Sequence, residues 1–254
     1  MSDQVIMAAG CMLRLLPKLL EQFGAIDQTK IRMAFGPSGS LRKKIDDGEK
    51  CSLFISAVSK HTEALLKTGK LYQSSVLGLN PTVLVCRSDL EISTETVLQF
   101  LTDPQWALGV STTGLDPDAD EVETLSKLSR TTDSNLERLI GRTRLITGGR
   151  ENPNAPTGRN QYGWIMETQD LDLLLTFQSN AMEAVADNPD LKFIQVPSSI
   201  RVIGHFGIGI SFDASAAIQK LYHWILSEQG QNTLAQHGFR GIKGNHSSES
   251  GRGQ

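Results

Sequence analysis

Residues 31–45 read IRMAFGPSGSLRKKI, and this stretch decides the class of fold. Residues 31–35 form a short apolar run that is typical of a buried strand. Gly36-Pro37-Ser38-Gly39-Ser40 breaks that strand, and the basic residues that follow are spaced as a helix. A strand, a Gly/Ser turn and a helix in this order predict an α/β unit. The turn is not a phosphate-binding P-loop, because it lacks the Gly-Lys-Ser/Thr ending.

The same alternation of strands and helices extends in both directions along the chain. Further apolar runs that we interpret as strands cover residues 5–8, 52–56, 82–86, 106–111, 173–177, 193–196 and 206–210. Helical spacing follows several of them, as in the apolar stripe from Met12 to Phe23, which Pro17 should kink or loosen. We therefore predict an α/β protein with mixed, mostly parallel sheets flanked by helices.

Composition and charge exclude several classes of protein. The chain has 254 residues, 39% apolar and 21% charged, which allows one large domain or two compact lobes. Its 25 Lys and Arg against 28 Asp and Glu give a net charge of −3, so we expect no nucleic-acid partner. The sequence contains no CxxC, no HExxH and no His/Cys cluster, so we expect no metal site and no cofactor.

The two ends of the chain show no targeting or membrane-spanning pattern. Gly10-Cys11 has some likeness to a lipoprotein cleavage box, but only the short apolar stretch 5–7 precedes it. A signal peptide requires a basic start and an apolar region of about 7–15 residues, so we interpret this segment as the first strand and expect no export signal in the chain as given. Residues 246–254 are rich in Ser and Gly, and we expect a disordered tail.

Small polar residues gather at the predicted strand-to-helix junctions. These junctions are Gly10-Cys11, Ser38-Gly39-Ser40, Ser111-Thr112-Thr113-Gly114 and Gly158-Arg159-Asn160. In α/β sheets such junctions lie at the carboxyl ends of strands, where ligands bind. A helix that begins there presents free N–H groups and the positive end of its dipole, which together favour an anion. The alternative is that each junction is an ordinary helix cap, because the same residue types are the preferred caps.

Three other features have competing interpretations. Cys11 at a helix start is either a nucleophile or a small buried residue, and no base is placed beside it in the sequence. The acidic run between Asp116 and Glu123 lacks EF-hand spacing and is interpreted as a solvated loop and a first helical turn. Arg159 lies beside a candidate anion site, but it can equally be a surface residue.

The sequence resembles the molybdate-binding proteins of ABC transporters, which have the type II periplasmic-binding-protein fold. The matching stretches run in order along residues 8–13, 35–41, 53–57, 110–117, 175–181 and 226–231, ending at Gly238-Phe239. The resemblance implies two lobes joined by crossing strands, with lobe I at 1–81 and 202–245 and lobe II at 82–201. It further implies hinges near Asn80 to Thr82 and near Pro197 to Val202.

The resemblance also implies the residues that would hold an oxyanion. Ser38 corresponds to a side-chain and amide donor of the first lobe, and Cys11 occupies the position of a donor Ser. Asp118, or the adjacent Ala119, corresponds to the amide donor of a second-lobe helix, and Arg159, or Asn160, to another. Phe177 occupies the position of a Tyr hydroxyl. Cys is a weaker donor than Ser and Phe donates nothing, and each lost hydrogen bond costs about 1.5–3 kcal/mol.

The resemblance favours a monomeric periplasmic binding protein that delivers a molybdate- or tungstate-like oxyanion to an ABC-transporter permease. An altered pocket at Cys11 and Phe177 leaves open a related binding protein or sensor for another small anion. An enzyme that uses Cys11 is the third hypothesis. It is disfavoured, because the spacings supply no set of nucleophile, base and orienting group.

Overall fold

The structure is a computed structural model that describes residues 4–24, 30–110, 120–146 and 155–241. Asp118, the turn at residues 111–114 and the 246–254 tail therefore lie outside the described residues. Among the described helices, none is long and apolar enough to cross a membrane.

The first group of elements, which we call lobe I, is built from both ends of the chain. Three parallel strands with their following helices form its N-terminal part. In chain order the elements are β1 Gln4–Ala9, the 3₁₀ helix η1 Gly10–Met12, α1 Leu15–Phe23, β2 Ile31–Gly36, α2 Ser38–Asp46, β3 Leu53–Ser56, α3 Ser59–Lys67, α9 Ala216–Leu226 and α10 Glu228–Gln236. Pro17 lies at the third position of α1, where a missing N–H costs little, so this helix simply begins after η1.

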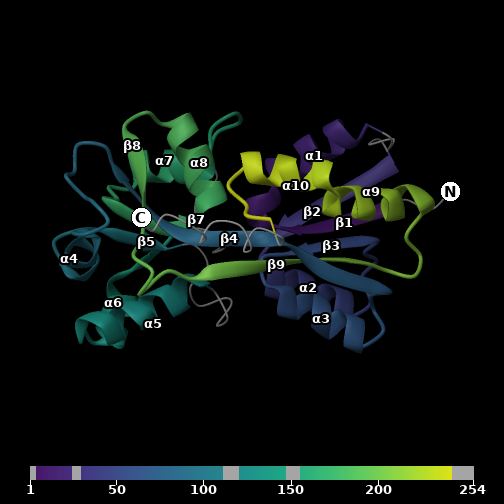
Figure 1. The fold of residues 1–254 in the computed structure, drawn as a ribbon, viewed down its shortest axis with the longest axis horizontal. Helices are drawn as coiled ribbons and strands as arrows, with labels where there is room; N and C mark the ends of the chain where they lie inside the picture. Colours follow the sequence, from purple (N-terminus) through teal and green to yellow (C-terminus); the bar gives the residue numbers. More distant parts are fainter. Residues whose placement is uncertain (1–3, 25–29, 111–119, 147–154, 242–254) are drawn as a thin grey trace, which may run out of the picture.

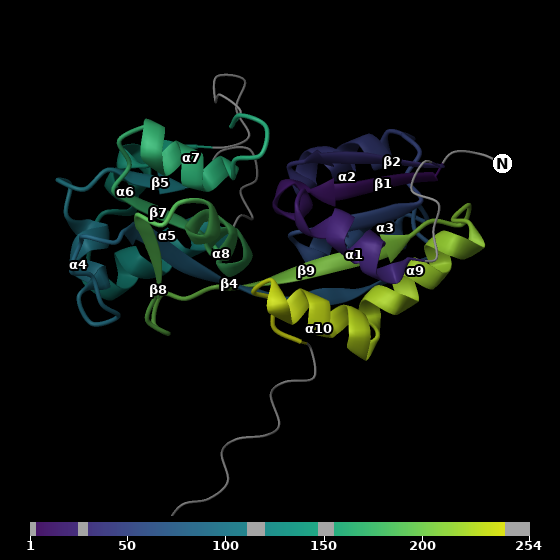
Figure 2. The same ribbon diagram turned by 90° about the horizontal axis from the view of Figure 1, so that it is seen from above.

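The second group, lobe II, comes from the middle of the chain. Its elements in order are α4 Val97–Thr102, β5 Leu108–Val110, α5 Asp120–Thr132, α6 Leu136–Arg142, β6 Arg144–Leu145, α7 Gln161–Thr168, β7 Leu173–Phe177, α8 Gln178–Asp187 and β8 Leu191–Gln195. Lobes I and II lie side by side (Figure 2), and helices lie above and below the strands of each lobe (Figure 1).

Two long strands, β4 Gln73–Arg87 and β9 Ile203–Ile210, join the lobes (Figure 1). The strand order is β2-β1-β3-β9-β4-β7-β5-β6, with β8 also paired to β4. Over residues 73–81, β4 pairs with β9, and from Thr82 onward it pairs with β7 and β8. Each antiparallel pairing among the described strands includes β4 or β9, whereas β1, β2 and β3, and likewise β5, β6 and β7, pair in parallel. The predicted α/β fold with mixed sheets is confirmed.

Each lobe has its own apolar core. In residues 31–45, the apolar residues of the helix face the core: Leu41 and Ile45 of α2 are buried in one cluster with Met7 and Phe54. Lys43 points outward and pairs with Asp47 one turn later, so the basic residues of α2 include an exposed one. Lobe II has core clusters on both faces of its sheet, where β7 is buried along its whole length. Full burial explains why this strand is apolar without alternation.

Candidate functional site

The carboxyl ends of β1, β2 and β3 meet at one edge of lobe I. Ala9 pairs with Gly36, and Ala8 pairs with both Phe35 and Ile55, so the three parallel strands end side by side. The chain then continues directly into η1, α2 and the turn before α3. Two of the predicted site residues, Cys11 and Ser38, therefore lie on neighbouring turns at the same edge.

Ser38 begins α2 and links it to the end of β3. Its side chain is buried, and its hydroxyl oxygen accepts a hydrogen bond from the Ala57 amide at 3.0 Å. A serine hydroxyl that accepts in this way still has one hydrogen to donate. Pro37, the residue that precedes the helix, supplies no side-chain cap. The start of α2 thus combines a fixed hydroxyl donor with a positive dipole end, an arrangement suited to an anion.

Cys11 lies on η1 and faces charges of lobe II. The pKa of its thiol is raised to about 12, mainly by burial and then by the nearby charge of Glu121, with a smaller contribution from Glu183, while a hydrogen bond of the Cys11 backbone lowers it. Glu121 belongs to the first turn of α5 and is buried, and Glu183 belongs to α8. A thiol with this pKa stays neutral at physiological pH, which makes it a weak hydrogen-bond donor and a poor nucleophile.

In lobe II, β5 and β7 also end at a common edge. Val110 pairs with Leu175, and the segment that follows β5, which includes the predicted donor Asp118, lies outside the described residues. Phe177 ends β7 and has its ring against that of Phe206 in β9, with centroids 5.1 Å apart. Phe206 in turn contacts Phe239 at 5.0 Å. The Phe177 side chain is therefore part of an apolar contact between the lobes.

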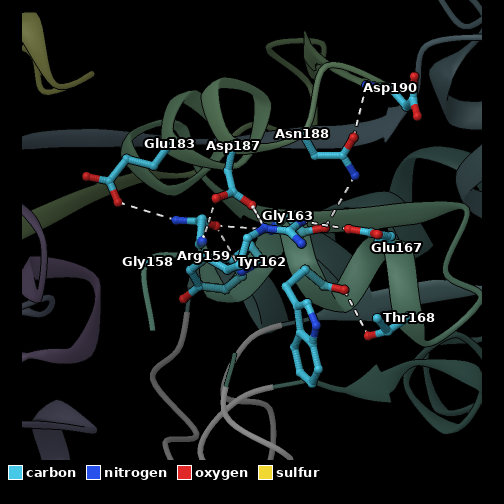
Figure 3. A network of polar contacts seen from close by, with 12 residues as sticks. Gly158, Arg159, Tyr162, Gly163, Glu167, Thr168, Glu183, Asp187, Asn188 and Asp190 are labelled. Atoms are coloured by element: carbon cyan, nitrogen blue, oxygen red, sulfur yellow. Dashed lines mark hydrogen bonds and ion pairs between the residues drawn. The ribbon is translucent and has the colours of Figure 1, made fainter. Parts of the chain in front are cut away.

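Arg159 and Asn160 hold the start of α7 against α8 (Figure 3). The Arg159 guanidinium pairs with Asp187 at 3.1 Å and with Glu167 at 2.6 Å. The Asn160 side chain accepts hydrogen bonds from the amides of Tyr162 and Gly163, which caps the helix. Both the cation and these two amides consequently have partners within lobe II, and the cap interpretation of this junction is confirmed.

Sequence reasoning placed a hinge near Asn80 to Thr82 but missed the hydrogen bonds that these polar residues make where β4 passes between the lobes. Asn80 is fully buried and exchanges two hydrogen bonds with Ser179 at the start of α8, of 2.8 Å from its amide nitrogen and 3.3 Å to its amide oxygen. The Thr82 hydroxyl lies 3.1 Å from the hydroxyl of Thr124, which itself donates to the Asp120 carbonyl. Asn80 and Thr82 thereby fix the first turns of α8 and α5. The signal was a polar residue inside an otherwise apolar run, at Asn80-Pro81.

Gly204 of β9 lies where three of these groups converge. A Cβ at this position would overlap the Asp120 carboxylate, and it would lie 2.9 Å from the Phe177 ring and 3.2 Å from the Asn80 carbonyl oxygen. Only glycine leaves room for this close approach of α5, β7 and β4.

A separate cavity of about 590 Å³ lies at the opposite edge of the lobe II sheet, near the beginning of β7. Arg87 lines it and pairs with Asp172 at 3.0 Å and Asp89 at 3.1 Å. The charges of this arginine are thus balanced within the cavity wall, and the cavity shares no residue with the predicted site.

The two lobes, joined by β4 and β9, form a fold of the periplasmic-binding-protein type. Similar solved structures include the periplasmic molybdate-binding protein of Azotobacter vinelandii, with a TM-score of 0.70, 15% identity and coverage of 93% of this chain and 98% of that one. The sulfate-binding protein SubI of Mycobacterium tuberculosis gives 0.71 and 14%, with coverage of 96% and 88%. At these identities the two structures show the fold.

The sequence comparisons agree. The family model of bacterial extracellular solute-binding proteins matches residues 5–240, and this chain belongs to that family. An uncharacterized protein of Pasteurella multocida is 29% identical over 215 residues, which cover 83% of this chain and 88% of that protein. The family consists of binding proteins and is not a class of enzymes.

Proposed function

We propose that this protein binds a small tetrahedral oxyanion, of the molybdate or tungstate kind, between lobes I and II. A periplasmic location and delivery to an ABC-transporter permease by a monomer belong to the same proposal. The boundaries proposed for the lobes are 81/82, where β4 exchanges β9 for β7 and β8 as pairing partners, and 201/202, just before β9 begins at Ile203. The residues proposed for the site are Cys11, Ser38, Asp118, Arg159 and Phe177; Phe177 would line the site without donating, and the Arg159 side chain would have to leave Asp187 or Glu167 to reach a ligand.

One observation carries this proposal, namely the geometry around Ser38. Its oxygen accepts a hydrogen bond from the Ala57 amide, which leaves its hydrogen available to donate to a ligand, and the dipole of α2 begins at the same residue. Preorganised neutral donors of this kind bind an anion without the cost of burying a cation. The molybdate-binding and sulfate-binding proteins of the same fold support an oxyanion as the ligand class.

The buried Glu121 favours a second candidate, an anion that carries its own proton. A carboxylate close to Cys11 repels a fully ionised ligand, but it can accept a hydrogen bond from a protonated one. Hydrogen phosphate and hydroxy acids have such a proton, whereas molybdate and sulfate at neutral pH do not. Phe177, which supplies no hydroxyl, is consistent with an altered specificity.

Titration calorimetry with molybdate, tungstate, sulfate and phosphate tests both candidates. Ser38→Ala should weaken binding of the true ligand by about tenfold or more, since a hydrogen bond to a charged group is lost. Ser40→Ala, on the exposed side of the same helix, is the matched control and should bind as the wild type does. Absence of heat with all four anions, together with no thermal stabilisation at millimolar concentration, would contradict the oxyanion proposal.

Phe177→Tyr separates the two candidates. A gain in molybdate affinity would indicate that the hydroxyl of a molybdate site has been lost from this chain. Unchanged molybdate binding, combined with heat from phosphate in the wild type, would favour the protonated ligand.

A further inference from the structure

Lobe I presents two positive charges to lobe II at the start of α1. Arg14 immediately precedes this helix, and Lys18 follows one turn later, so the two side chains share a face. The Arg14 guanidinium donates a hydrogen bond to the Gly158 carbonyl of lobe II at 3.4 Å. This contact joins residues 144 positions apart and links the two lobes outside the crossing strands.

The lobe II side of this contact is held in position. Arg159, the residue after Gly158, pairs with Asp187 of α8, and the Asn160 amide donates to the same carboxylate at 2.8 Å. Gly158 itself has φ +92°, a conformation that favours glycine and directs its carbonyl. The acceptor for Arg14 is therefore presented by a turn anchored to α8.

A negative charge from α8 completes the arrangement. The Asn160 side-chain amide lies 3.5 Å from the Glu183 carboxylate, next to the turn that carries Gly158 (Figure 3). Burial raises the pKa of Glu183, and the positive charges of Lys18 and Arg14 lower it, so both cations act on this carboxylate across the lobes. Lys18 also lowers the pKa of His237 beyond α10, a smaller effect than burial.

We propose that the hydrogen bond from Arg14 to the Gly158 carbonyl, supported by the attraction between Glu183 and the two cations, is an inter-lobe latch that favours the close approach of the two lobes. Residues that stabilise the closed arrangement without touching the ligand raise its affinity, because closure then costs less of the binding free energy. The effect on affinity rests on the proposed function, whereas the effect on the distance between the lobes does not.

Small-angle X-ray scattering on the full chain, without ligand and with sodium molybdate, tests the latch. Arg14→Gln combined with Lys18→Gln should increase the radius of gyration of the ligand-free protein, as should Glu183→Gln. Lys43→Gln is the matched control, because Lys43 is an exposed lysine paired with Asp47 of its own helix. Sodium chloride at about 1 M shortens the Debye length to about 3 Å. It should therefore increase the radius of gyration of the wild type and leave that of the latch variants unchanged.

Calorimetry on the same variants measures the effect on binding. For whichever anion binds the wild type, the latch variants should raise Kd by about two- to fivefold, as expected for partly exposed charges. Equal radii and equal salt responses in the wild type and the latch variants would overturn the latch, even if an anion binds. A radius that responds as expected in a protein that binds no oxyanion would support the latch and contradict the proposed function.

Discussion

Gly204→Ala tests whether the two lobes meet as closely as the structure shows. The added methyl group would overlap the Asp120 carboxylate and lie 2.9 Å from a Phe177 ring carbon. The carboxylate can rotate away, but the ring is packed against Phe206 and the Asn80 carbonyl is main chain at 3.2 Å. Overpacking of this kind costs about 1–3 kcal/mol. Because each kcal/mol lowers Tm by about 2–4 °C in a chain of this size, we expect a fall of about 2–12 °C.

Gly141→Ala provides the control for this experiment. Gly141 is exposed in α6, and an added Cβ there would meet nothing within 4 Å. Replacing a glycine inside a helix with Ala should stabilise the protein by about 0.5–1 kcal/mol. Differential scanning calorimetry of the two variants should therefore show Tm shifts of opposite sign. A Gly204→Ala protein that melts at or above the wild-type temperature would refute the close approach of α5, β7 and β4.

Three further measurements address other contacts. Asn80→Ala should lower the free energy of unfolding, measured with urea, by about 1–3 kcal/mol, because it leaves the buried Ser179 amide without its acceptor. Adding Ser179→Ala to this variant should lower the free energy of unfolding little further. Additive losses would argue against a direct interaction between the two residues. The rate of Cys11 alkylation, measured by peptide mass spectrometry, should rise about tenfold per pH unit from pH 7 to 10, because a pKa of about 12 keeps the reactive thiolate scarce. A rate that levels off near pH 9 would contradict the raised pKa. Phe206→Ala should lower the free energy of unfolding by about 3–5 kcal/mol in the same assay. A loss below about 1 kcal/mol would exclude a packing role for the aromatic contacts with Phe177 and Phe239.

The local pattern of apolar residues predicted the bounds of an element correctly where the whole element lies in one environment, such as a fully buried strand. The strand predicted at 173–177 has the same bounds as β7, because burial on both faces makes it a continuous apolar run. The strand predicted at 82–86 covers only the last third of β4. The preceding part of β4, residues 73–81, contains Gly78, Asn80 and Pro81, which are turn signals, yet pairing with β9 holds this part extended. Tertiary pairing overrides propensity at this point.

The site was harder to predict than the fold, because its contacts join distant parts of the sequence. The sequence showed Arg159 beside a candidate anion site, but its partner Asp187 is 28 residues further on. Asn80 meets Ser179 across 99 residues, and no spacing rule connects them. Ser38 was identifiable because a strand end, a small polar residue and a helix start are consecutive there. Ala57, which fixes the Ser38 hydroxyl, gave no signal because it acts through its main chain.

The two chain passages between the lobes are hydrogen-bonded to each other, and this restricts how the lobes can move. β4 and β9 are paired from Gln73 to Pro81, and Thr82 continues the contact through its amide, which donates to the Val202 carbonyl at 2.9 Å. A translation of one lobe along the strand direction would break this whole ladder, whereas bending of the ribbon leaves it intact. Bending of this ribbon is thus the displacement that costs least, and a protein that opened and closed in this way would return the same side chains to the same neighbours.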